Sequence, residues 1–207
     1  MGYFAGALLE LQEWSQGSPI TINTLSAFMI AKSDNTATEA LMDILGDQAL
    51  QEFSGSNGIV LSPNQAFKLK FSEDANLVQS YAESSKDQQE EMLVDLDTAS
   101  LPDRVTWNNP IAIDTVEWFY STRELCQMME QVQGHPVMTI NSGVANPENW
   151  NHVAFKGGSE PGVLNLTTWL ESEKSSFCVS LTQNDTASAL DEDAATSLYS
   201  GILNILN

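Results

Sequence analysis

The pattern of apolar residues changes once along the chain, and this change limits the fold more than any other feature. Before Asn146, apolar side chains recur at three- and four-residue intervals, which is typical of helices. Three short segments with alternating apolar and polar residues follow, at 153–156, 163–170 and 177–182. Alternation of this kind, with turn residues between the segments, predicts antiparallel strands. A helical pattern over 187–206 closes the chain. Helices, then strands, then one helix indicate an α+β fold.

Capping residues and glycines place the other expected helices. These helices cover 1–14, 25–32, 36–45, 47–53, 63–71, 73–95 and 122–132. The segment 21–24 is expected to cap the second, Ser121 or Thr122 the last, and Asp185 or Thr186 the closing helix. Residues 101–115 have no regular period and contain two prolines, which predicts a long irregular loop, and such loops are often functional.

Composition excludes several classes of function. Of the 207 residues, 42% are hydrophobic, which is enough for a packed core. Eight basic residues stand against 28 acidic ones, a formal net charge of -20. A surface this negative repels phosphate backbones and anionic lipids, so we expect no nucleic-acid partner. No apolar run reaches the roughly 18 residues of a membrane span. We interpret the charge as a solvated acidic surface, or as adaptation to salt water, where screening weakens self-repulsion.

Cysteine and histidine are too sparse for a disulfide scaffold or a zinc site. The two cysteines, Cys126 and Cys178, are expected to be buried free thiols rather than a pair. The two histidines, His135 and His152, are far apart in the sequence and are expected to be structural or surface residues. We therefore expect neither a metal nor another cofactor.

Two short motifs are the strongest candidates for chemistry. The first is Ser33-Asp34-Asn35, between two predicted helices. The second follows a predicted strand at 156–159 and reads Lys-Gly-Gly-Ser. Taken singly, the first is an ordinary helix cap and the second an ordinary turn. Their order along the chain gives them more weight.

The two motifs and their surroundings resemble the penicillin-recognising serine hydrolases, the family of class A β-lactamases and penicillin-binding proteins. The segment MIAKSDNTATEALMDILG is similar to the Ser-Asp-Asn segment of class A-like enzymes, and KGGSEPGVLNLTTWL to a strand pair in a related subgroup that has KGG in place of KTG. The segment STRELCQMMEQV resembles the helix after the active-site Ω loop. The resemblance implies one β-lactamase/transpeptidase-like domain over 1–207, with a helical lobe at about 1–135 and the sheet with its closing helix at about 150–207.

The resemblance also implies a role for each motif residue. Ser33 would shuttle a proton, and Lys156 would face the carboxylate of a small amide, ester or β-lactam-like substrate. Asn35 would bind the amide side chain of that substrate, and Asp34 would point inward and hold the loop. The remaining positions are Gly157 and Gly158, which would let the backbone approach the ligand, and Ser159, whose backbone N–H would be an oxyanion-hole donor.

The sequence departs from the family pattern in two places. The family nucleophile lies in a Ser-x-x-Lys motif, and no such motif precedes Ser33. The similarity of YFAGALLE to the rest of that helix would place the motif lysine at about Met1, so we expect an N-terminally truncated chain without its nucleophile. The family's Ω-loop glutamate also has no counterpart in 101–115, which contains Asp103 instead, so rapid β-lactam turnover is not expected.

These departures leave three interpretations open. The chain is an incomplete serine hydrolase, or a non-catalytic protein that keeps the ligand pocket, or an interaction module. The third follows from the expected sheet, because a truncated sheet would leave strand 177–182 as an edge through which the chain could self-associate. No lysine or arginine precedes Lys32, so we expect no secretory signal in this chain, and the compartment stays open.

Overall fold

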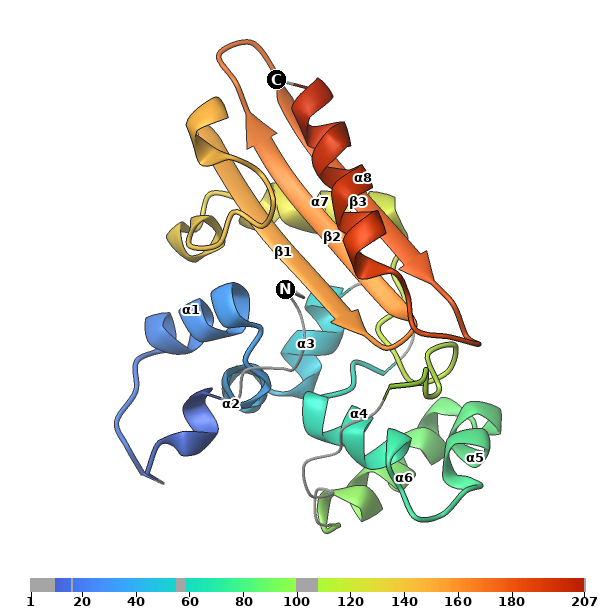
Figure 1. The fold of residues 1–207 in the computed structure, drawn as a ribbon. Helices are drawn as coiled ribbons and strands as arrows, with labels where there is room; N and C mark the ends of the chain where they lie inside the picture. The colour runs from blue at the N-terminus through green and yellow to red at the C-terminus, as the bar shows by residue number, and fades with distance from the viewer. Residues whose placement is uncertain (1–9, 16, 55–58, 100–107, 207) are drawn as a thin grey trace.

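A computed structural model describes residues 10–15, 17–54, 59–99 and 108–206 (Figure 1). The helices before the sheet are α1 (Ile22–Lys32), α2 (Asn35–Leu45), α3 (Asp47–Ser54), α4 (Pro63–Lys70), α5 (Leu77–Glu83), α6 (Lys86–Asp97) and α7 (Thr122–Val132). The strands are β1 (His152–Glu160), β2 (Val163–Glu171) and β3 (Ser176–Asn184), followed by α8 (Glu192–Ile205). Three short 3₁₀ turns are η1 (Glu10–Glu13), η2 (Pro136–Thr139) and η3 (Pro147–Asn149).

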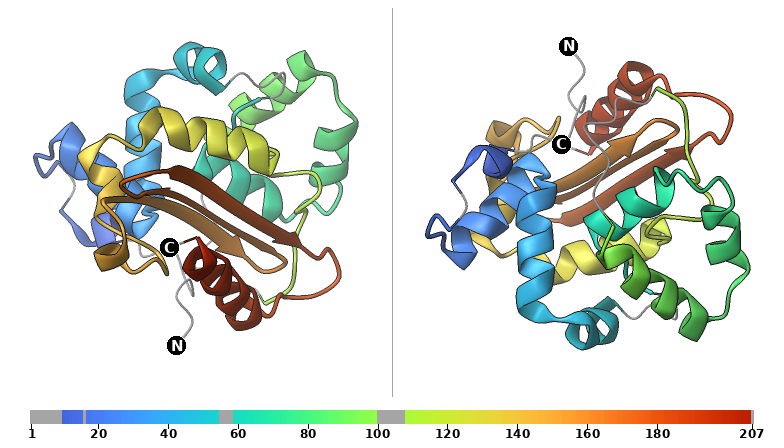
Figure 2. Two further views of the ribbon diagram at one scale, coloured as in Figure 1. Left: turned by 90° about the horizontal axis from the view of Figure 1, so that it is seen from above. Right: turned by 90° about the horizontal axis from the view of Figure 1, so that it is seen from below.

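The three strands form an antiparallel sheet in the order β1-β2-β3, covered by a helix on each face (Figure 2). On the α8 side, alternate strand residues such as Phe155, Leu164 and Leu166 pack against Tyr199 and Leu203. Burying each such side chain contributes about 1.5–3 kcal/mol. The hydroxyl of Tyr199 donates to Thr168 Oγ1 at 2.9 Å and so fixes the helix on the sheet.

The opposite face of the sheet meets α7 and η2. Met129 of α7, Met138 of η2 and Ala154 of β1 form its buried cluster. Helices α1 to α6 lie beyond one end of this layer, in a helical lobe with its own apolar clusters around Leu25 and Leu69 (Figure 1). Lys156 and other polar residues on the face of the sheet that meets α7 and η2 lie between the sheet and the lobe.

The predicted α+β fold with three antiparallel strands and a closing helix is confirmed. Ser121 caps α7, one of the two residues expected there, and Thr21, within the expected segment 21–24, caps α1, which therefore begins at Ile22 rather than at residue 25. The segment 73–95, predicted to be helical, forms two helices, α5 and α6, because the capping box of Ser85 starts the second one. The closing helix begins later than predicted.

Asp191, rather than Asp185 or Thr186, caps this closing helix. The carboxylate of Asp185 is engaged instead in the preceding turn, where it accepts from Ala187 N at 2.8 Å and Ser188 N at 3.3 Å. A carboxylate used in an Asx turn cannot also cap a helix that starts further along the chain.

The expectation of two free thiols is wrong, because Cys126 and Cys178 form a disulfide. Their sulfurs are 2.07 Å apart and their Cα atoms 5.7 Å apart. Cys126 lies on α7 and Cys178 on β3, and α7 packs directly over this face of the sheet. The two residues are 52 positions apart in the sequence, so only the packing of helix on sheet reveals the pair.

Some predictions fall partly or wholly outside the described residues. Of the helix expected over 1–14, only the 3₁₀ turn η1 lies within them. The irregular loop over 101–115 is described from Asn108 onward, and that part forms neither helix nor strand. Asp103 lies outside the described residues. Strand β3 is an outer strand of the described sheet, and self-association through it stays a prediction.

The described residues contain neither a membrane-spanning helix nor a cluster of metal-binding side chains. None of the helices there is both long and apolar enough to cross a membrane. Nor do the described side chains include a group of three or more histidines, cysteines, aspartates or glutamates able to hold a metal ion.

Candidate functional site

Ser33 occupies a sharp turn between two helices. It ends α1 with φ of 52° and ψ of 40°, the left-handed conformation that few residues other than glycine adopt. The turn is held from outside as well, because Asn141 Nδ2 donates to the carbonyl of Ala31 at 3.3 Å. The half-buried Ser33 is therefore fixed at the junction rather than carried on a flexible loop.

Asp34 anchors the same junction from within. Its side chain is fully buried, and its Oδ1 caps α2 by accepting from Ala37 N at 2.9 Å. Its Oδ2 accepts from Leu11 N at 3.2 Å, which ties η1 to the turn. A buried carboxylate with two backbone donors is well compensated, and this arrangement agrees with the supporting role expected for Asp34.

Lys156 of β1 meets Ser33 across the gap between the sheet and the lobe. Its Nζ donates to Ser33 Oγ at 2.7 Å and also to the carbonyl of Gly157. The two residues are 123 positions apart in the sequence. Burial of the ammonium group disfavours its charged form and lowers the pKa of Lys156 to about 8.

The register of the sheet turns the backbone N–H of Ser159, three residues after Lys156, away from β2. Gly162 O accepts from Asp185 N at 2.8 Å, so the even-numbered residues of β2 bond to β3 and the odd-numbered ones to β1. Ser159 is opposite the even-numbered Leu164. The N–H of Ser159 therefore points to the edge of β1 that no other described strand covers.

The two glycines of the motif differ in what surrounds them. A side chain at Gly157 would lie 2.9 Å from the ring of Phe155 and 3.1 Å from the carbonyl of Asn165, so packing within the sheet requires glycine there. Gly158 has open space around the corresponding position. Glycine at this second position keeps the cleft clear rather than relieving a clash.

A large cleft runs between the lobe and the sheet, and the predicted residues other than the buried Asp34 meet along it. Its lining includes Ser33, Asn35, Lys156, Gly157, Gly158 and Ser159. Another wall is aromatic: Trp118 is 44% and Phe119 61% exposed, and the indole of Trp118 donates to Leu61 O at 3.0 Å. The cleft thus offers a hydroxyl, an ammonium group, an N–H that no described strand bonds, and an apolar wall.

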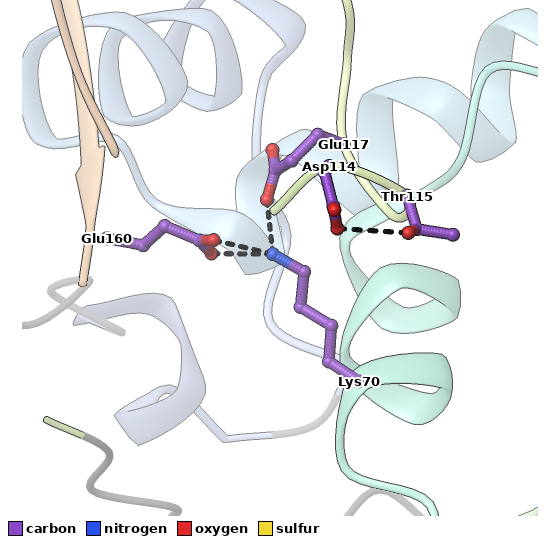
Figure 3. Close-up of polar contacts among 5 residues, drawn as sticks. All are labelled: Lys70, Asp114, Thr115, Glu117 and Glu160. Atoms are coloured by element: carbon purple, nitrogen blue, oxygen red, sulfur yellow. Dashed lines mark hydrogen bonds and ion pairs between the residues drawn. The ribbon is translucent and has the colours of Figure 1, made fainter. Parts of the chain in front are cut away.

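A charged cluster that was not predicted from the sequence lies in the same cleft; Figure 3 shows its residues. The ammonium of Lys70, at the end of α4, binds Glu160 of β1 at 2.7 and 2.8 Å and is also paired with Glu117. Burial, together with the negative charge of Glu117, raises the pKa of Glu160 to about 7, although Lys70 opposes this shift. One cation thus joins the lobe, the segment before α7 and the end of β1.

The only signal that could have pointed to this cluster was the position of Glu160, which directly follows the Lys-Gly-Gly-Ser motif. Its partners are 90 and 43 residues away, and no local pattern connects them. The ion pairs of Lys70 hold strand β1, which carries Lys156, against the lobe that carries Ser33.

Comparison with known structures shows the fold. The ancestral class A β-lactamase GNCA is 17% identical, with a TM-score of 0.54, and the alignment covers 95% of this chain and 68% of that one. Two variants of the class A β-lactamase from the last common ancestor of Gram-negative bacteria are also 17% identical over 92% of this chain, with TM-scores of 0.50 and 0.52. The second is bound to 5(6)-nitrobenzotriazole. The chain spans 64% of the length of each variant.

A search of curated proteins gave no match. The family comparison, in contrast, covers almost the whole sequence, since residues 4–202 match the model of the Beta-lactamase enzyme family. The fold, the Ser33–Lys156 pair and this match agree with the resemblance seen in the sequence motifs. The chain belongs to the Beta-lactamase enzyme family.

Proposed function

We propose that the cleft binds a small amide, ester or β-lactam-like molecule that carries a carboxylate, and that it serves serine-hydrolase chemistry through an acyl-enzyme. The observation that carries this proposal is the 2.7 Å hydrogen bond between Lys156 Nζ and Ser33 Oγ, which joins the sheet to the lobe. Membership of the Beta-lactamase enzyme family supports the reaction class.

Each residue has a part in this proposal. Lys156 holds the substrate carboxylate, because it is one of few cations in a very acidic chain. Ser33 shares that carboxylate and relays a proton to the leaving atom. Asn35 bonds the substrate's amide side chain, and the N–H of Ser159 stabilises the developing oxyanion. Asp34 keeps the Ser33 turn in place.

A second candidate is a ligand-binding protein that performs no hydrolysis. One observation favours it: Glu117, which lies in the cleft, is committed to Lys70. A glutamate held in an ion pair is a poor general base, so we expect slow deacylation of any acyl-enzyme. Both candidates require the same carboxylate site.

To test the carboxylate site, the affinities of a ligand with and without its carboxylate charge are compared in the native chain and in a variant of Lys156. Benzylpenicillin carries a negatively charged carboxylate, and its methyl ester does not. Isothermal titration calorimetry measures the affinity of the protein for each. Lys156→Met should weaken benzylpenicillin binding roughly 10- to 150-fold, because a hydrogen bond to a charged group contributes about 1.5–3 kcal/mol. The ester should bind Lys156→Met and the native chain equally.

Lys174→Met is the matched control, because Lys174 is exposed in the turn between β2 and β3. It should leave both affinities unchanged. If Lys156→Met weakens binding of the acid and of the ester equally, Lys156 does not bind the carboxylate, and the proposed function is wrong.

A further inference from the structure

We propose that Glu160 sets how strongly the cleft binds anionic ligands: its carboxylate repels the ligand carboxylate held by Lys156, and uptake of a proton by Glu160 removes this repulsion. The proposal rests on the proposed function, since it assumes that charged Lys156 holds a carboxylate. It adds a specificity-determining residue, and it makes the affinity for anionic ligands depend on pH while the affinity for neutral ligands stays constant.

The first support is the charge balance of the cluster in Figure 3. One ammonium group, that of Lys70, is shared by the two carboxylates of Glu117 and Glu160, so the ionised cluster has one negative charge in excess. The side chain of Lys70 is 3% exposed, and those of Glu117 and Glu160 are 16% and 18% exposed, so water screens the cluster poorly. Of two carboxylates that share a site, one keeps its proton to higher pH.

The second support is the place of Glu160 relative to Lys156. The two residues are four positions apart on β1, and because side chains alternate along a strand, both lie on the same face. Four residues of strand span about 13 Å. Both residues line the cleft. Two unit charges at this distance change an affinity roughly 2- to 10-fold, depending on how well the medium between them screens.

The charged groups that face Glu160 come from two elements of the lobe side. Helix α4 provides Lys70, and the segment before α7 provides Glu117. Figure 3 also shows Asp114 of this segment, whose carboxylate accepts from Thr115 Oγ1 at 3.1 Å. A second cation that would balance Glu160 is not drawn into this contact, since the pKa of Glu160 responds to Lys70 and Glu117.

Helix α8 adds further negative charge. Three acidic residues at its start line the same cleft, namely Asp191, Glu192 and Asp193. The side chain of Glu192 is hydrogen-bonded to Ser159, an odd-numbered residue of β1 that lies on the opposite face of the strand from Glu160. These carboxylates do not neutralise Glu160.

The two pKa values define the pH range of the effect. Burial, and then the charge of Glu117, raise the pKa of Glu160 to about 7 against the opposing effect of Lys70, so Glu160 is neutral below this pH and ionised above it. Lys156, with a pKa of about 8, is mostly charged at pH 7, as carboxylate binding requires. An anionic ligand favours neutral Glu160 and charged Lys156. Its affinity therefore falls as the pH rises through about 7, and again through about 8.

Proton uptake leaves the link between the strand and the lobe in place. Both carboxylate oxygens of Glu160 accept from Lys70 Nζ, at 2.7 and 2.8 Å, and the oxygen that stays unprotonated continues to accept. Lys70 also keeps its ion pair with Glu117. The charge of the cleft changes and its shape does not, so a neutral ligand should not respond.

Isothermal titration calorimetry with benzylpenicillin and its methyl ester tests the proposal on the native chain and on Glu160→Gln. Glutamine resembles the protonated side chain and still accepts from Lys70. At about pH 8, Glu160→Gln should bind the acid roughly 2- to 10-fold more tightly than the native chain, and at about pH 5.5 the two should bind it equally. The ester should bind both proteins equally at either pH.

Glu173→Gln is the matched control. It removes the same charge from an exposed residue in the turn between β2 and β3, which does not line the cleft. Its affinities for the acid and the ester should equal those of the native chain at both pH values.

Carbon-13 NMR of the Glu160 carboxyl group gives a second measurement, on the native chain and without a variant. The carboxyl group should titrate near pH 7, and saturating benzylpenicillin, but not the ester, should move its titration to higher pH.

Each contrary result has a distinct meaning. A Glu160 that stays ionised down to about pH 5, or a Glu160→Gln variant with the native pH profile, overturns the role of Glu160 and leaves the carboxylate site at Lys156 standing. Equal changes for acid and ester also overturn it, because the effect is then not one of charge. If the acid is never preferred over the ester, the proposed function fails together with this inference.

Discussion

At the scale of single residues, the backbone of Ser33 limits what this position tolerates. An L-residue in the left-handed region costs roughly 1–2 kcal/mol, a cost that glycine avoids. Ser33→Gly and Ser33→Ala both remove the hydroxyl that binds Lys156, so they differ only in the β-carbon. Strain at this position accords with a functional residue rather than one selected for stability.

We therefore predict that Ser33→Gly is more stable than Ser33→Ala by about 1 kcal/mol, after the larger unfolded-state entropy of glycine is deducted. Urea unfolding of the two variants measures this difference. Equal stabilities would mean that residue 33 is not in the left-handed conformation.

The residue scale also shows how far the site could be predicted from the sequence. Ser33 and Lys156 belong to two local motifs that the sequence alone reveals. The contact of Lys70 with Glu160 has no such motif, because the two residues lie on α4 and β1 and are 90 positions apart. Only tertiary packing brings them together.

At the scale of elements, periodicity predicted the strands well, because each has one buried apolar face that fixes a two-residue repeat. Helix boundaries were predicted less well where several caps compete. Asp185 and Asp191 are both good caps, and the choice between them depends on the turn after β3. The pairing of α7 with β3 had no signature in either segment.

The disulfide between these two elements leads to a prediction about stability. It closes a loop of 52 residues, so replacing both cysteines, Cys126→Ala with Cys178→Ala, should cost roughly 2–4 kcal/mol. Urea unfolding of the oxidised protein and of the variant measures this cost. Reductant should destabilise the native chain but not the variant, and reactive thiols in the unreduced native chain would show that the bond does not form.

At the scale of the whole molecule, 28 acidic residues against 8 basic ones create self-repulsion that the fold must overcome. Salt shortens the screening length from about 10 Å at 0.1 M to about 3 Å at 1 M. We predict that the melting temperature rises over this range of potassium chloride, by about 2–4 °C for each kcal/mol of relieved repulsion. A flat or falling melting temperature would show that the charge is too dispersed to matter.

Our central claim also concerns the whole molecule: the lobe and the sheet form one carboxylate-binding cleft, and Ser33 and Lys156 line it. A crystal structure of the chain with benzylpenicillin tests this claim most directly. We expect the ligand carboxylate, or that of its opened form, within hydrogen-bond distance of Lys156 Nζ. A ligand bound away from the cleft, or Ser33 and Lys156 on separate surfaces of the crystallised protein, would contradict it.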